Sequence, residues 1–209
     1  MQDDSRLYKL LTEGWLYDAF QDLIGRRSAI RWMADNVWKC RGNESVLDIG
    51  CGTGRLLEYL PSGVQYTGFD ISEKYIESAQ RRYGARAQFV VGTAREFLEG
   101  GRDRLSIADL VLCSGVLHHL EDDEALDVLK LAKQQMNPGG RLVCMEPVYL
   151  AKQSRLSRFI ISRDRGKNVR TERAWKELAG TVFSSFTTSV LTGLIRIPYV
   201  HIVIECRNA

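Results

Sequence analysis

Short apolar runs alternate with helical segments through the middle of the chain, and this alternation limits the possible fold more than any other feature. Five of the runs are typical of buried strands, and the segments between them have helical spacing or end in turn residues. The predicted strands of this region are residues 45–50, 64–71, 88–91, 107–113 and 141–146. Strands that alternate with helices form parallel sheets with helices on both faces. The chain is therefore predicted to have an α/β fold with a doubly wound, mostly parallel sheet.

The two ends of the chain extend this core. Apolar residues at helical spacing between Leu7 and Trp38 predict an N-terminal helical extension. Residues 183–191 and 199–206 are β-rich and predict a terminal antiparallel pair. With the five central strands they give a seven-stranded sheet whose last strand is antiparallel. A length of 209 residues, of which 44% are apolar, fits a single domain with a sizeable core.

Composition excludes several classes of protein. No stretch approaches the ~18 consecutive apolar residues of a membrane span, and the acidic N-terminus lacks the apolar core of a signal peptide. The five cysteines are odd in number and none belongs to a CxxC pair, so neither a disulfide framework nor a zinc ribbon is expected. We therefore expect reduced thiols, a cytoplasmic protein and no metal site.

A glycine-rich loop follows the first predicted strand directly, in the run DIGCGTG at Asp48–Gly54. Glycines in such a loop permit a tight turn and let the backbone approach a ligand closely. The G-x-G-x-G spacing differs from the G-x-G-x-x-G of dinucleotide-binding loops, and no Lys-Ser/Thr pair follows as in a P-loop. The loop by itself is also compatible with a purely structural turn.

An acidic residue at the end of the second strand narrows the choice of ligand. Asp70 lies 22 residues after Asp48 and closes the run that begins at Gln65. A carboxylate at this place in a doubly wound sheet can accept hydrogen bonds from both hydroxyls of a ribose. A ribose acceptor beside a loop that lacks the pyrophosphate spacing favours a mononucleoside ligand.

These motifs together resemble those of class I S-adenosylmethionine-dependent methyltransferases. The run Leu47–Gly54 is similar to motif I of that family. The similarity continues through Gly68–Ser72, Asp109–Leu120 and the turn Asn137–Gly140, and it is strongest to the small-molecule branch that includes quinone-ring methyltransferases. The resemblance implies methyl transfer as the activity and S-adenosylmethionine as the cofactor.

The resemblance also implies one Rossmann-like domain over residues 1–209. Its predicted parts are an N-terminal helical cap (1–40), a cofactor-binding core (41–147) and an acceptor-side segment with the last strands (148–209).

Roles for individual residues follow from the same resemblance. Gly50 and Gly52 are expected to approach the aminoacyl part of the cofactor and Asp70 to hold its ribose. Ile71 flanks the adenine, the backbone of Ala94 meets the edge of the adenine ring, and Ser114 lies near the methionine part. The full set of expected cofactor-binding residues is Asp48, Gly50, Cys51, Gly52, Gly54, Asp70, Ile71, Thr93, Ala94 and Ser114.

Two positions depart from the family pattern. Thr93 stands where many relatives carry an aspartate that contacts the adenine amino group. The arginine often found before the Pro-Gly-Gly turn is absent, and Gln134–Met136 occupies that region. Neither departure affects the glycine loop or Asp70.

Two histidines are candidate catalytic residues. His118 and His119 follow the fourth strand, at the edge where open α/β sheets bind ligands. A histidine with an ordinary pKa of ~6.5 can accept a proton near neutrality, which methyl transfer requires only if the acceptor must lose one. The alternative is that one histidine caps local backbone and the other packs beside the cofactor. Glu146 and Tyr149 follow the fifth strand and are further candidates.

Positive charge is concentrated after the fifth strand. Residues 152–173 hold eight basic and two acidic residues, a local charge of +6 in a chain whose net charge is +3. The segment is predicted to recognise an anionic acceptor, with Tyr149, Arg163 and Arg165 as acceptor-binding residues. The alternatives are a solvated basic face and a helix that lies on an anionic membrane surface. Aromatic residues are sparse there, which argues against nucleic acid.

Three functions are consistent with these features. The favoured one is methyl transfer to a small, anionic acceptor that is phosphorylated, glycosyl or lipid-linked. An RNA or protein methyltransferase that docks through residues 152–173 is the second. The third is a non-catalytic module that binds S-adenosylmethionine.

Overall fold

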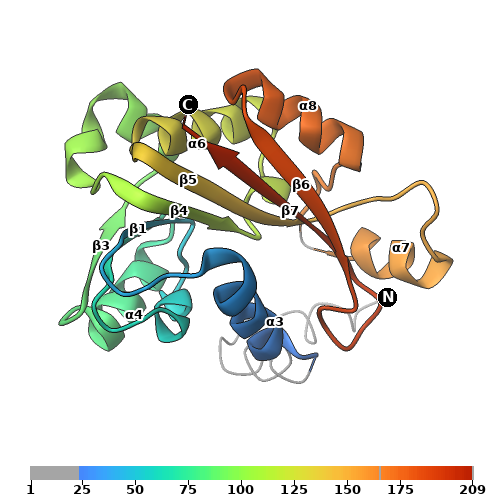
Figure 1. Cartoon of the computed structure of the whole chain (residues 1–209), viewed down its shortest axis with the longest axis horizontal. Helices are drawn as coiled ribbons and strands as arrows, with labels where there is room; N and C mark the ends of the chain where they lie inside the picture. The colour runs from blue at the N-terminus through green and yellow to red at the C-terminus, as the bar shows by residue number, and fades with distance from the viewer. Residues whose placement is uncertain (1–23, 165, 209) are drawn as a thin grey trace, which may run out of the picture.

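Figure 1 shows a computed structural model of the chain, which describes residues 24–164 and 166–208. The helical extension predicted between Leu7 and Trp38 lies only partly in this range. Its described part consists of the α-helix α3 (Arg26–Met33) and the π-helical turn η1 (Ala34–Trp38).

A seven-stranded sheet forms the centre of the described part, in the order β3-β2-β1-β4-β5-β7-β6. Neighbouring strands from β3 to β5 are parallel, whereas β7 is antiparallel to both β5 and β6. The strands are β1 Ser45–Ile49, β2 Gln65–Asp70, β3 Ala87–Val91, β4 Ala108–Ser114, β5 Met136–Pro147, β6 Phe186–Thr192 and β7 Val200–Arg207. The predicted α/β fold, with its mostly parallel sheet and antiparallel last strand, is confirmed.

Helices cover both faces of this sheet (Figure 1). The longer ones are α4 (Glu73–Tyr83), α6 (Asp122–Gln134), α7 (Arg155–Ser162) and α8 (Glu172–Val182). The shorter ones are η2 (Arg55–Tyr59), α5 (Ala94–Glu96), η3 (Phe97–Gly101), η4 (Arg102–Arg104) and η5 (Leu117–His119). Polar N-caps begin several of them: Ser72 accepts from the backbone N–H of Tyr75 at α4, and Thr171 from that of Ala174 at α8.

The side chains of β1 alternate between two hydrophobic layers, as the pleat of a strand requires. Leu47 and Ile49 pack in the layer that includes residues of α6 and α8, whereas Val46 packs on the opposite face with residues of α3 and α4. Because both faces of β1 are covered, its run is apolar almost throughout, which is what made it recognisable as a buried parallel strand.

The strand order changes direction between β1 and β4. From β1 the chain continues outward to β2 and β3 on one side, and it then returns to β4 and β5 on the other. At such a point the loops that follow the two neighbouring strands diverge, and ligands of open α/β sheets bind in the crevice between them. The loops after Ile49 and Ser114 flank this position.

One predicted turn lies inside a strand. Residues 137–140 belong to β5, whose first residue, Met136, pairs with Ala108 before the pairing resumes between Arg141 and Leu110. The strand pairing shifts register between these two pairs. The predicted turn is therefore an irregular part of β5 and does not precede the strand. Among the described residues, no helix has the length and apolarity that crossing a membrane requires.

Candidate functional site

The glycine loop lies at the carboxyl end of β1, where the strand order changes. Gly50 and Gly52 have φ angles of +68° and +54°, which L-residues with side chains rarely adopt. A Cβ atom on Gly50 would lie 2.5 Å from a methyl group of Val116, so the loop packs closely against the segment after β4. A Cβ atom on Gly52 would meet nothing within 4 Å. One side of the loop is therefore packed, and the other borders open space.

Asp70 joins the glycine loop to the start of α4. One carboxylate oxygen accepts from the backbone N–H of Gly52 at 2.9 Å, and the other accepts from that of Ser72 at 2.8 Å. Each oxygen keeps a second lone pair, so the carboxylate can still accept bonds from a diol. Ile71, the next residue, is 73% exposed, which is unusual for an apolar side chain at the end of a buried strand. The pair offers a polar acceptor beside an open apolar surface.

Two of the expected cofactor residues, Asp48 before the loop and Cys51 within it, are buried. Asp48 is buried and accepts a hydrogen bond from the hydroxyl of Tyr66. Burial raises the pKa of Asp48 to about 7, against the effect of the Tyr66 hydrogen bond and together with the charge of Asp70. Cys51 is also buried, and its backbone N–H donates to the carbonyl of Phe69 at 2.9 Å. These contacts fix the loop against β2.

Thr93 caps the short helix α5 at the end of β3. Its hydroxyl oxygen accepts from the backbone N–H of Glu96 at 3.2 Å, and the Glu96 carboxylate accepts from the backbone N–H of Thr93 at 2.8 Å. This is a capping box, and it buries Ala94 in the first turn. The hydroxyl proton is the part of Thr93 that remains for a ligand, so this position can donate where an aspartate would accept.

Ser114 is the last residue of β4. Its hydroxyl is buried and has no hydrogen-bond partner among the described residues. Buried hydroxyls without a partner are rare because they lose their bonds to water. This one marks a place where a polar ligand atom would complete the structure.

His118 is held by a buried carboxylate. Glu146, at the end of β5, is fully buried and accepts from the backbone N–H groups of Val116 and Leu117, both at 3.0 Å, and of His118 at 3.3 Å. The same carboxylate lies 2.6 Å from Nδ1 of the His118 ring. The turn after β4 is thus fastened to the end of β5.

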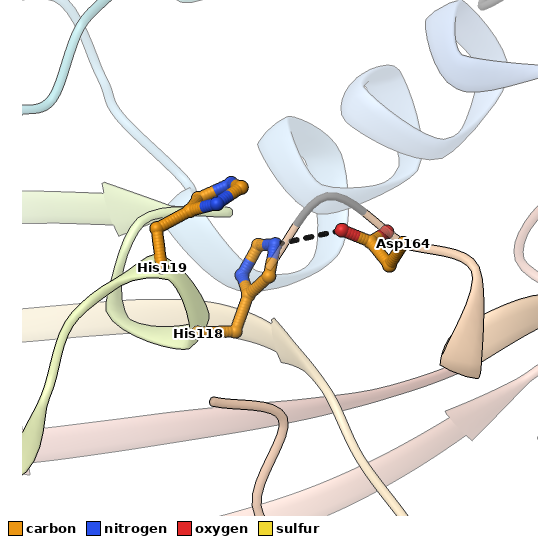
Figure 2. A group of neighbouring side chains, drawn as sticks. All are labelled: His118, His119 and Asp164. Carbon is orange, nitrogen blue, oxygen red and sulfur yellow. Dashed lines mark hydrogen bonds and ion pairs between the residues drawn. The ribbon is translucent and has the colours of Figure 1, made fainter. Parts of the chain in front are cut away.

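The second ring nitrogen of His118 contacts Asp164, as Figure 2 shows. The distance from Nε2 to the carboxylate is 3.2 Å, and the other oxygen of Asp164 accepts from the hydroxyl of Tyr199 at 2.6 Å. Burial alone would lower the pKa of His118, but the hydrogen bonds to Asp164 and Glu146 outweigh it and raise the pKa to about 9. A raised pKa favours the imidazolium form at neutral pH, in which both ring nitrogens carry a proton and neither can accept another.

His119 has a different environment. It is exposed, and its ring stacks on that of His118 with 4.1 Å between the centroids. The carboxylates that bond to both ring nitrogens of His118 were not identified from the sequence as its partners. Asp164 could have been noticed as one of only two acids in the basic segment, but its contact with His118 joins residues 46 apart.

The basic segment does not form one continuous cationic surface. Arg158 stacks over Tyr149, with 4.9 Å from the guanidinium carbon to the ring centre, and Arg163 stacks over Phe159 at 5.1 Å. Arg165, the third predicted acceptor residue, lies outside the described residues. Arg163, the other predicted acceptor-binding arginine, is exposed.

Arg170 points inward and is a structural residue that sequence reasoning placed in the charged surface. Its guanidinium donates to the carbonyls of Leu117 and Leu120, each at 2.9 Å, and to the carboxylate of Asp122 at 2.7 and 2.9 Å. It also lies over the ring of Trp175. Arg170 thus clamps the turn after β4 to the segment that precedes α8.

Comparisons with known proteins agree with this geometry. Residues 46–140 match a family described as methyltransferase domain. The mitochondrial ubiquinone biosynthesis O-methyltransferase of Schizosaccharomyces pombe is 33% identical over 108 residues, which are 50% of this chain and 38% of that protein. The ubiquinone biosynthesis O-methyltransferase of Aromatoleum aromaticum is 32% identical over 101 residues, which are 46% of this chain and 41% of that protein. The chain thus spans about two fifths of the length of these relatives.

Solved structures share the fold. The pyocyanin biosynthetic protein PhzM matches with a TM-score of 0.72 at 16% identity, over 97% of this chain and 61% of that one. Human N-acetylserotonin methyltransferase, solved with S-adenosylmethionine, matches with a TM-score of 0.67 at 20% identity, over 92% of this chain and 54% of that one. At these identities the likeness concerns the architecture, which is the one built above from the strand order.

Proposed function

We propose that the chain transfers a methyl group from S-adenosylmethionine to a small molecule. The premise is that residues 46–140 form a class I S-adenosylmethionine-dependent methyltransferase domain. The observation that carries the proposal is the junction of Gly52 and Asp70 where the strand order changes. There a backbone turn with open space beside it is bonded to a carboxylate that retains acceptor capacity. This is the arrangement that a nucleoside with an attached amino acid needs.

The residues at this junction fit the cofactor. Asp70 would accept from the ribose hydroxyls, the exposed side chain of Ile71 would cover one face of the adenine, and Ala94 would meet the ring edge. The unpartnered hydroxyl of Ser114 would take up a polar group of the methionine part. The assignments of Ile71 and Ser114 use groups that the protein by itself leaves exposed or unsatisfied, and that of Asp70 uses its remaining lone pairs.

When bound, S-adenosylmethionine supplies a methyl group on a positively charged sulfonium. The protein must then position the acceptor in line and exclude water. His118 acts as a positioning residue in this scheme, since Glu146 and Asp164 occupy its two ring nitrogens. It fixes the acceptor-side segment against the turn after β4 and does not abstract a proton.

We further propose an anionic acceptor with an apolar part, such as a phosphorylated or lipid-linked molecule. Helix α7 exposes Leu156 and Phe159, at 60% and 55%, beside exposed basic side chains. The basic residues of this surface are Lys152, Arg155, Arg158 and Arg163. A surface that combines apolar and cationic groups attracts amphiphilic anions and also suits an anionic lipid surface.

The cofactor assignment is tested by calorimetry with S-adenosylhomocysteine. We expect Asp70→Ala to bind about 10- to 100-fold more weakly than the unmodified protein, because it loses charge-assisted hydrogen bonds of about 1.5–3 kcal/mol. Asp103→Ala, which removes an exposed aspartate of η4, is the matched control and should bind normally. Equal affinity in all three proteins contradicts the ribose assignment.

The acceptor class is tested with labelled S-adenosylmethionine and a panel of a phosphorylated sugar, a lipid-linked phosphate, a quinol and tRNA. We expect label to pass to an anionic small molecule. Replacement of Arg163 by Gln should raise the apparent KM for that acceptor and leave cofactor affinity unchanged, because Arg163 is exposed and is not among the expected cofactor residues. Label on tRNA would favour docking of RNA through the basic segment.

A further inference from the structure

His118, His119 and Asp164 bring three metal-binding groups together beside the end of β4. One ligand atom from each residue lies within 4.8 Å of the other two, and Figure 2 shows the two rings and the carboxylate grouped together. Nε2 of His118 is 3.2 Å from the carboxylate of Asp164. Two ligands that each lie about 2.0–2.1 Å from a zinc ion, at a tetrahedral angle, are about 3.3 Å apart. The spacing of these two atoms matches that value.

The His118 ring also has the outer partner that metal-binding histidines commonly have. Nδ1 lies 2.6 Å from the fully buried carboxylate of Glu146, which fixes the ring and leaves Nε2 as the nitrogen directed at Asp164. A carboxylate that accepts from the distal ring nitrogen sets the tautomer and makes the ligating nitrogen more basic. Glu146 is itself held by three backbone N–H groups, so this orientation is rigid.

Asp164 is fixed in a similar way. Oδ2 accepts from the hydroxyl of Tyr199, and Oδ1 accepts from the backbone N–H of Gly166 at 3.0 Å. A carboxylate with these bonds keeps further lone pairs for a cation. Two of the three ligand side chains are therefore held in place by the fold before any ion binds.

We propose that His118, His119 and Asp164 bind one divalent transition-metal ion, with zinc as the best-fitting example and a fourth coordination position left open. Two imidazoles and one carboxylate are a donor set that suits zinc and related ions. An open position is typical of zinc sites that take part in a reaction. Binding of the ion displaces the proton of His118 Nε2 together with its hydrogen bond to Asp164, and the ligand atoms, which lie within 4.8 Å of one another, draw closer around the ion.

The role of this ion rests on the proposed methyl transfer, whereas its binding does not. The site follows β4 directly and adjoins the acceptor-side segment through Asp164. An acceptor hydroxyl at the open position would lose its proton to solvent, because a bound divalent cation lowers the pKa of an oxygen ligand. Its oxygen would then bond to the methyl carbon as the carbon–sulfur bond breaks, which leaves a neutral thioether. The substrate class is thus an alcohol or phenol.

The sequence predicts no metal site, and the proposal revises that expectation. Two of the ligands are adjacent, but Asp164 follows His118 by 46 residues and lies among basic neighbours. Sequence motifs for metal sites depend on a fixed spacing, so they detect metal ligands that lie on one helix or one hairpin. This set depends on how the segment after β5 folds back over the turn after β4.

The test uses the full chain after removal of metal with a chelator, and cobalt as the probe. Visible absorption of bound Co²⁺ reports on ligand number, and competition with Zn²⁺ reports on affinity. We expect one equivalent of cobalt with absorption typical of a four- or five-coordinate site. The side chain of His119 is exposed, so His119→Ala should leave the fold intact. We expect this variant to bind cobalt at least about 10- to 100-fold more weakly, the loss that is typical when a residue that supports a metal ligand is removed.

Asp164→Asn provides a second variant that keeps the size of the side chain, with Asp103→Asn as its control. Weaker cobalt binding in His119→Ala and Asp164→Asn, together with normal binding in Asp103→Asn, supports the site. Absence of cobalt binding, or equal binding in all variants, overturns it. Calorimetry with S-adenosylhomocysteine on the same samples separates the two proposals, since the cofactor site does not include these residues.

Discussion

The two sides of the strand-order change satisfy their polar groups in different ways. On the proposed cofactor side, Asp70 bonds to backbone N–H groups of the glycine loop and of the adjacent turn, and the space next to Gly52 stays open. On the proposed acceptor side, His118, Glu146 and Asp164 bond mainly to one another and to neighbouring backbone. The first side is a backbone cradle, in which main-chain N–H groups and glycines surround the open space. The second is a network of side chains, in which each charged group is stabilised by hydrogen bonds to the others.

This difference predicts which side tolerates change. A backbone cradle loses ligand affinity when one side chain is altered, but it retains its fold. A buried network loses stability when one member is removed, because the remaining charges are left without partners. The predictions below set the two sides against each other.

The largest effect is expected at Glu146, the buried centre of the network. Glu146→Ala leaves three backbone N–H groups and the charged ring of His118 without their acceptor. We expect the free energy of unfolding to fall by about 3–5 kcal/mol. Urea denaturation measures it, and Glu99→Ala, at an exposed glutamate, should change it by less than about 0.5 kcal/mol. A loss at Glu146 as small as that at Glu99 would mean that the network carries no stability.

Within the cofactor side, Gly50 and Gly52 should behave differently. Gly50→Ala brings a Cβ atom against Val116 and fixes a side chain at positive φ, which together cost about 2–4 kcal/mol. Gly52→Ala has the φ cost alone, about 1–2 kcal/mol. Its main effect should be weaker binding of S-adenosylhomocysteine. Thermal unfolding and calorimetry on both variants separate the two effects, and equal destabilisation would show that the space beside Gly52 is filled.

His118 and His201 should give opposite pH dependence in metal-free protein. The pKa of His118 is raised to about 9, so its contribution to stability is complete below about pH 6.5 and is lost as the pH rises towards 9. The pKa of His201 is lowered to about 4, first by burial and then by the charge of His118, against the opposing effect of Asp164. Its neutral form is favoured, so stability is lost as the pH falls from about 6.5 towards 4.

Urea denaturation at pH 5, 7 and 9 in the presence of a chelator measures both histidines. His118→Gln should flatten the alkaline decline relative to the unmodified protein, and His201→Gln should flatten the acidic one. If His118→Gln leaves the alkaline decline unchanged, the ring is not held as an imidazolium by Glu146 and Asp164.

The smallest effect is expected from the clamp at Arg170. Arg170→Lys keeps the charge but loses the planar fork that reaches two carbonyls and Asp122, at a cost of about 1–2 kcal/mol. Arg173→Lys is a matched control in the same segment, because Arg173 forms an exposed ion pair with Glu177 and should have almost no effect. Chemical denaturation of both variants decides whether Arg170 is structural or part of the charged surface.

The meeting of the glycine loop and Asp70 could be predicted from the sequence because its determinants are local. The glycine loop, Asp70 and Ile71 each follow a strand whose apolar run is easily recognised, and parallel strands bring their carboxyl ends to one edge. The network around His118 could not be predicted, because the contact of His118 with Asp164 depends on the path of the chain after β5. Arg170 was placed in a charged surface for the same reason, since a sequence does not show which carbonyls a guanidinium will reach.

For the fold, too, the sequence predicts local features but not every long-range contact. The strands and their parallel order follow from alternation, and the antiparallel pair at residues 183–191 and 199–206 is present as β6 and β7. The insertion of β7 between β5 and β6 is not encoded in any local pattern. It depends on which strand edge offers the better cross-strand packing once both are available.

That insertion has a consequence for how the protein is made. Strand β7 occupies the outer edge of β5, yet residues 148–199 are synthesised between the two strands. At ~5–20 residues per second, the ribosome needs about 3 to 10 s to cross this interval. Throughout that time the nascent chain presents β5 with one unpaired edge, and such an edge is a template for pairing with another chain. Yield in a cell is thus governed by the speed of translation across this interval as well as by the stability of the finished fold.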